Sequence, residues 1–232
     1  MNDFYTAIRT AVDLITGFDS DLIEIVVLSL KISTSAVFIA TLIGLPLAAL
    51  IALRPFPGRS FVIAVLNSFM GLPPVVVGLL VYLLLSRAGP FGSYGLLFTP
   101  DAMIIAQTFL VLPIIIALSR QTLTDLLQEY AEQFRSFRLT IFQSAMTLIW
   151  EGRFSLVTAV LAGFGRASAE VGAVMIVGGN INHVTRVMTT SIALETNKGN
   201  LSLALGLGFI LISLTFLVNL LAYSVQRLEQ RS

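Results

Sequence analysis

Five long runs of apolar residues constrain this chain more than any other feature of its sequence. They cover about residues 24–52, 61–85, 101–119, 155–178 and 203–224. A membrane-spanning helix needs roughly 20 mostly apolar residues, because no water satisfies its backbone inside the bilayer. Each run is close to that length or longer. The sequence therefore predicts an all-α polytopic membrane protein with five transmembrane helices, forming one membrane domain over residues 1–232.

The composition agrees with this fold class and excludes several functions. Of the 232 residues, 56% are hydrophobic and 12% are charged, about half the charged share of an ordinary soluble domain. The net charge of +1 offers no basic surface, so we expect a lipid bilayer and no nucleic acid as partner. The absence of cysteine and the single histidine argue against a metal site.

Prolines interrupt three of the five runs. Pro46 lies in the first run, Pro73 and Pro74 in the second and Pro113 in the third. Kinks and breaks in membrane helices are tolerated where protein or a water-filled cavity satisfies the freed backbone groups. This pattern favours a transporter or a channel over a simple anchor.

Residues 1–23, ahead of the first run, do not have the pattern of a cleavable signal peptide. Apolar residues recur in this segment at helical spacing, namely Phe4, Ile8, Ala11, Val12 and Ile15. We expect a short amphipathic helix that lies in the membrane interface.

The distribution of basic residues predicts the orientation in the membrane. One side receives eight arginines: Arg54, Arg59, Arg120, Arg135, Arg138, Arg153, Arg227 and Arg231. The other side receives Arg9, Arg87, Arg186 and Lys198. Because cytoplasmic loops carry the excess of Lys and Arg, we expect a cell (inner or plasma) membrane protein with its N-terminus outside and its C-terminus in the cytoplasm.

The connection over about residues 120–154 has a helical pattern of its own. Apolar residues recur at i, i+3, i+4 and i+7 between Leu123 and Phe137, with charged residues on the other faces. This predicts an amphipathic cytoplasmic helix. It either rests on the membrane or bundle, or serves as a docking surface for a soluble partner.

The fourth run holds the most informative residues. Gly165, Ala169 and Ala173 recur every four residues, a spacing that lets helices approach closely. Arg166 and Glu170, also four apart, are two ionisable groups inside a predicted span, where they must pair or face a cavity. They fit a structural ion pair, a lining of the translocation path or its gate, or both roles together.

No enzyme motif accompanies these spans. The two lysines, Lys31 and Lys198, do not follow a glycine as a P-loop requires, and no Gly-x-Ser-x-Gly occurs. His183, in a loop with no carboxylate close in sequence, receives no role. The chain is not expected to be an enzyme by itself.

The segment Gly163-Phe-Gly-Arg-Ala-x-x-Glu-Val-Gly-Ala173, continuing into Val177-Gly-Gly-Asn180, resembles the signature of oxyanion permeases in ABC importers. That branch serves sulfate, molybdate and tungstate. The longer run Glu170–Ile181 with Thr185–Thr190 and Leu194–Thr196 is most similar to tungstate-type permeases. Gly44-Leu-Pro, Pro55-Phe-Pro-Gly-Arg59 and Leu72-Pro73 agree in order, so the resemblance covers about residues 40–225.

This resemblance implies a type I importer that passes an oxyanion, tungstate first, into the cytoplasm by alternating access. The implied partners are a second copy of the chain (a homodimer), two ABC ATPase subunits and an extracytoplasmic anion-binding protein. ATP and Mg would be bound by the ATPase, so no cofactor is expected in this chain. The alternatives are a molybdate, sulfate or phosphate permease of the same architecture, and a channel or secondary transporter.

The resemblance also implies roles for particular residues. Members of the family carry a cytoplasmic Glu-Ala-Ala segment whose helix docks into the ATPase, and Glu129-Tyr130-Ala131 matches its opening, with Arg135 where the pattern has glycine. We assign coupling to Glu129, Tyr130, Ala131, Phe134, Arg135 and Arg138. We assign the translocation path, its gate and helix packing to Gly165, Arg166, Ser168, Ala169, Glu170, Gly172, Ala173 and Asn180.

Overall fold

The computed structural model describes residues 5–6, 8–9, 12–13, 16–17 and 20–229, and of residues 222–223 and 225–229 the backbone alone. The helix predicted in the membrane interface within residues 1–23 lies in part outside the described residues and stays a prediction.

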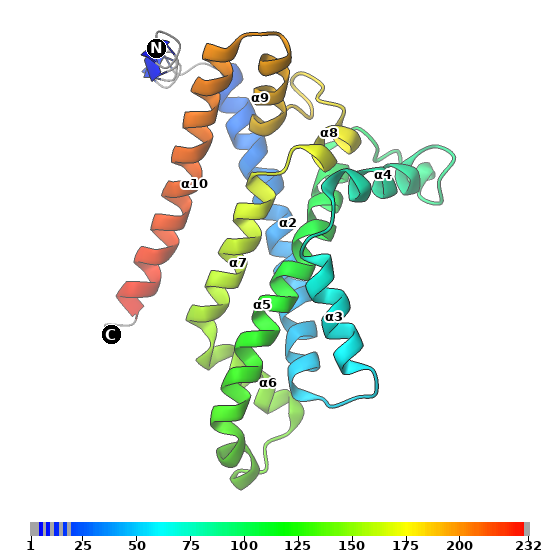
Figure 1. Cartoon of the computed structure of the whole chain (residues 1–232), viewed down its shortest axis with the longest axis vertical. Coiled ribbons are helices and arrows are strands. Elements are labelled where there is room, and N and C mark those ends of the chain that lie inside the picture. Colours follow the sequence, from blue (N-terminus) through cyan, green and yellow to red (C-terminus); the bar gives the residue numbers. More distant parts are fainter. Residues whose placement is uncertain (1–4, 7, 10–11, 14–15, 18–19, 230–232) are drawn as a thin grey trace. The chain divides into compact units, whose positions relative to one another are not determined.

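The described part of the chain is helical, without β-strands. Figure 1 shows the elements in order. They are α2 (Ser20–Leu53), α3 (Arg59–Phe69), α4 (Pro74–Leu85), η1 (Gly92–Tyr94), α5 (Pro100–Ser136), α6 (Ile141–Glu151), α7 (Arg153–Ser168), α8 (Gly172–Gly178), α9 (Met188–Asn197) and α10 (Leu201–Glu229).

Three described helices, α2, α5 and α10, are each long and apolar enough to cross a membrane. Two further pairs qualify when each pair is counted as one interrupted span: α3 with α4, and α6 with α7, which is bent by 76°. The described residues thus hold three to five candidate spans. The membrane fold is confirmed, while the count of five stays a prediction.

The prediction of one continuous helix over 155–178 is wrong. The helix α7 ends at Ser168 and α8 begins at Gly172. The Glu170 carboxylate accepts a hydrogen bond from the Ala173 N–H at 3.1 Å, which satisfies a free donor at the start of a new helix. The sequence between these helices contains no proline that would have marked the break.

The helix predicted after residue 120 is not a separate element. The helix α5 runs for 37 residues with Pro113 inside it, so the expected separate helix after residue 120 is the last part of α5. It ends where Arg138 takes a left-handed conformation, with φ of 50°. The helical pattern continues from residue 120 onward, so the sequence contains no signal that would end the helix earlier.

The chain divides into two compact units, each assembled from separate segments. One comprises Met1–Ser35, Pro73–Gln107 and Ser168–Ser232. In it, Leu22 of α2, Met188 of α9, and Leu207 and Ile210 of α10 form a buried apolar cluster. The other comprises Ala36–Leu72 and Thr108–Ala167.

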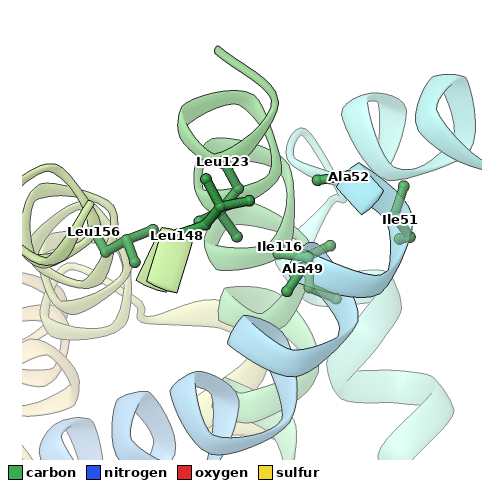
Figure 2. Close-up of a cluster of buried hydrophobic side chains, with 8 residues drawn as sticks. Ala49, Ile51, Ala52, Ile116, Leu123, Leu148 and Leu156 are labelled. Atoms are coloured by element: carbon green, nitrogen blue, oxygen red, sulfur yellow. The ribbon is translucent and has the colours of Figure 1, made fainter. Parts of the chain in front are cut away.

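The second unit has its own core, in which α2, α5, α6 and α7 each contribute side chains (Figure 2). Leu123 of α5 and Leu148 of α6 are fully buried there. The α2 side is mostly alanine, so α5 approaches it closely. At the end of α2, Arg59 Nε donates to the Ile51 carbonyl at 2.8 Å and satisfies one of the last carbonyls of the helix.

Candidate functional site

The end of α7 lies against the break between α3 and α4. Arg166 Nη2 donates a long hydrogen bond, 3.5 Å, to the carbonyl of Leu72. Leu72 immediately precedes Pro73, where α3 has ended and α4 has not begun. A break inside a membrane span leaves carbonyls that need a donor, and the Arg166 guanidinium supplies one.

Glu170 fixes the start of α8. Its side chain is buried and accepts a hydrogen bond from the Ala173 N–H in the first turn of α8. Its carbonyl accepts a 2.8 Å hydrogen bond from Thr189 Oγ1 of α9. Because α7 ends between Arg166 and Glu170, the shared helix face that motivated their pairing is absent, and the pairing itself stays a prediction.

The small residues assigned to helix packing divide into two groups. Ala173 and Gly172 lie where α8 packs on α4: a Cβ on Gly78 would be 2.8 Å from Ala173 Cα, and a Cβ on Gly172 would be 3.0 Å from Val75 Cγ2. A Cβ on Gly165 would have no atom of the described residues within 4 Å, and Ala169 is exposed. Ser168 and Asn180 are half-buried.

The loop after α8 is held in one conformation by Thr185. This fully buried hydroxyl donates to the Gly178 carbonyl at 2.6 Å and accepts from the Ile181 N–H at 2.9 Å. Arg186 adds a 2.7 Å hydrogen bond to Asn182 Oδ1. Sequence reasoning missed Thr185; the Gly179-Asn180 pair, both with positive φ, was the available signal for a tight turn.

Two contacts join this loop to α2 within the same unit. His183 Nδ1 lies 2.8 Å from Glu24 Oε2, and the Met188 N–H donates to Ser29 Oγ at 2.8 Å. The sequence interpretation gave His183 no role, because no carboxylate is close to it in sequence; the partner in the structure, Glu24, is 159 residues away in the chain.

Thr185→Val is expected to destabilise the fold by about 1–3 kcal/mol, because it leaves the Gly178 carbonyl and the Ile181 N–H without their buried partner. Thermal unfolding of the detergent-purified protein measures this change. Thr196→Val is the matched control, since the Thr196 hydroxyl is exposed and bonds only to a carbonyl of its own helix. Equal Tm values for both variants would contradict the assignment.

The His183–Glu24 contact predicts a pH dependence. The hydrogen bond and charge of Glu24 raise the pKa of His183 above 6.5. A raised folded-state pKa means that the stabilisation is complete below pH 6.5 and is lost as pH rises through the higher folded value. Amide exchange in residues 181–187 is therefore expected to accelerate as pH passes upward through this range, after correction for intrinsic rates. In His183→Gln this dependence should disappear.

The residues assigned to coupling lie at the end of α5 and in the turn that follows. Glu129 and Arg135 are exposed, and Tyr130 stacks on Phe134 with ring centroids 6.1 Å apart. Phe134 packs against the core of the second unit. The exposed charges thus lie at the end of α5, and the aromatic side chains of the same segment anchor that end to the core.

The turn from α5 to α6 is closed by backbone and side-chain bonds. Arg138 has positive φ, and the Leu139 N–H donates to the Phe134 carbonyl at 3.2 Å. Thr140 and Gln143 then form a reciprocal capping box that starts α6. The positive φ at Arg138 falls three residues after Arg135, the position where the resembling family has glycine.

Comparison with known proteins gives relatives that match over most of the chain. A probable anion ABC transporter permease protein of Haloferax volcanii is 42% identical over 205 residues, covering 86% of this chain and 88% of the relative. The tungstate uptake system permease protein TupB of Peptoclostridium acidaminophilum is 38% identical over 218 residues, 94% of this chain and 96% of that protein. This chain belongs to the ABC transporter permease family.

Other relatives of the permease are consistent with that membership. TupB of Campylobacter jejuni is 40% identical over 172 residues, 74% of this chain and 72% of that protein. The sulfate transport system permease protein CysT of Salmonella typhimurium is more distant, with 26% identity over 217 residues, 89% of this chain and 77% of its own length. No family model matches the permease. These relatives are all transport permease proteins by name.

Proposed function

We propose that this permease is the membrane subunit of an ATP-driven uptake system for an oxyanion, and that the oxyanion is tungstate. The observation that carries the proposal is the 38–40% identity to two tungstate uptake permeases. Sulfate permeases match at 26–30% identity. Molybdate, sulfate and phosphate remain the competing substrates within the same architecture.

The proposed assembly has two copies of the permease, two ATPase subunits that bind ATP and Mg, and an extracytoplasmic anion-binding protein. The permease lies in the cell membrane with its N-terminus outside and its C-terminus in the cytoplasm, an orientation supported by the excess of arginine on one side of the predicted spans. ATP binding to the ATPase subunits shifts the equilibrium between the inward-facing and the outward-facing state of the permease. This shift drives alternating access.

The coupling surface is proposed at the end of α5. Its support is the combination of exposed charges at Glu129, Arg135 and Arg138 with anchoring of Phe134 in the core. Because Phe134 is packed in the core, a displacement of this helix end would also displace the buried core residues. The path is proposed along the broken segment that contains Arg166 and Glu170, since breaks inside membrane spans are typical of cavity-lining helices.

The experiment that tests the function measures ATP turnover of the complex in proteoliposomes, with the binding protein loaded in turn with tungstate, molybdate or sulfate. Stimulation by the tungstate-loaded protein alone supports both the importer class and the substrate. Equal stimulation by several anions removes the substrate assignment and keeps the class. Turnover that no loaded binding protein changes would contradict both.

A further inference from the structure

An apolar groove lies between the end of α2 and α6, both within the second unit. Its cavity volume is about 380 Å³, within the range of roughly 300–1,000 Å³ of small-molecule sites. Leu50, Leu53 and Arg54 line it from α2, and Phe142, Ala145 and Met146 from α6; the four other lining residues are apolar. Phe142 and Met146 are exposed in the single chain, at 74% and 57%.

The charge in the groove comes from a single side chain. Arg54 is its only charged lining residue and directly follows the last residue of α2, a candidate membrane span. Among the ion pairs of the described residues, none involves Arg54. A nearby arginine, Arg59, is already bonded to the α2 carbonyls. The groove therefore combines nine apolar lining residues with one cation that follows the end of a candidate membrane span.

The helix that forms the other wall also carries a marker of the membrane interface. Trp150 of α6 is 66% exposed, and the Arg153 guanidinium lies 4.7 Å from the centre of its ring. Tryptophan is enriched at the level of lipid headgroups, where an indole sits beside water and apolar chains at once. A cation that follows a candidate span on one wall and an exposed tryptophan on the helix of the other wall are typical of a groove at a membrane interface.

We propose that this groove binds a phospholipid with an anionic headgroup, with an acyl chain between α2 and α6 and the headgroup phosphate on Arg54. An acyl chain needs no hydrogen bonds, and the nine apolar lining residues offer it contacts. An inserted peptide segment would bring backbone groups that these walls leave unsatisfied. The positive charge of Arg54 complements the phosphate of a headgroup that carries no compensating cation. This site is independent of the transported anion.

The test uses native mass spectrometry of the detergent-purified complex, from which the permease is released in the gas phase. Phosphatidylglycerol and phosphatidylcholine with identical acyl chains are titrated in turn. Phosphatidylglycerol is expected to be retained about fivefold more than phosphatidylcholine, the factor that one basic residue near an anionic lipid provides. Arg54→Gln should lower phosphatidylglycerol retention to the phosphatidylcholine level. Arg153→Gln, outside the groove lining, should retain the wild-type preference.

A second variant tests the apolar part of the groove. Ala145→Trp fills it and is expected to lower retention of both lipids, and Ala145→Leu to lower it by less. Equal retention of the two lipids by the wild type, or an unchanged preference in Arg54→Gln, overturns the proposal. So does an Ala145→Trp complex that keeps its lipids but loses the ATPase or the second permease copy, because that result assigns the groove to a protein partner.

Discussion

Replacing Gly78 with valine is expected to lower the Tm of the purified permease by roughly 5–10 °C and to abolish transport. A Cβ at this position would lie 2.8 Å from Ala173 Cα and 3.3 Å from its carbonyl oxygen. Both are backbone atoms, so no change of rotamer relieves the clash and α4 must move away from α8. Overpacking of this kind costs about 1–3 kcal/mol, and 1 kcal/mol corresponds to roughly 2–4 °C for a chain of this size.

Gly208→Val is the matched control for this variant. Gly208 lies on α10, and a Cβ there would have no described atom within 4 Å. Thermal unfolding in detergent and uptake in proteoliposomes should separate the two variants. A Gly78 variant as stable and active as the Gly208 variant would show that α4 and α8 do not need this close approach.

Glu129→Arg is expected to weaken binding of the ATPase subunit at least about tenfold, while the permease still inserts and keeps its Tm. The carboxylate is exposed on the last turns of α5, so the change leaves the core intact. Like charges placed opposite each other across an interface cost several kcal/mol, and 1.4 kcal/mol is tenfold in affinity. Co-purification of the ATPase at graded salt concentrations measures the effect.

Asp101→Arg gives the same reversal of charge at the opposite end of α5, where Asp101 is also exposed. It should leave ATPase binding unchanged. Undiminished co-purification with Glu129→Arg would remove the coupling assignment. Deleting residues 123–138 is a poor substitute for the point variant, because fully buried Leu123 would leave the core together with the surface residues.

The parts of the fold that follow from chain composition were predictable. The runs at 24–52 and 203–224 correspond to α2 and α10 within a few residues, because hydropathy alone determines where a helix can cross a bilayer. The Pro73-Pro74 pair also marked the break between α3 and α4. A structural feature with one local cause, such as a long apolar run or a proline pair, can therefore be predicted from the sequence.

The break between α7 and α8 could not be predicted in this way. It depends on Glu170 bonding to the Ala173 N–H and on Thr189 holding the Glu170 carbonyl. The second partner lies 19 residues away. Helical periodicity likewise predicted a helix after residue 120 but carried no information on whether α5 had stopped before it.

The candidate site shows the same division. The coupling residues were assigned because a short motif falls on an amphipathic pattern, and their role stays a prediction. The contacts that hold the loop after α8 were missed, because His183 meets Glu24 and Met188 meets Ser29 across 159 residues of sequence. Only the folded chain brings these pairs together.

The chain passes between its two compact units four times, after residues 35, 72, 107 and 167. Two of these passages lie inside the continuous helices α2 and α5, and two lie at or beside the ends of helices. A helix resists bending because its hydrogen bonds must lengthen, whereas a break has few such bonds to strain. The two units are thus linked by two stretches of unbroken helix and by two stretches at helix ends, where the Leu72 carbonyl accepts from Arg166.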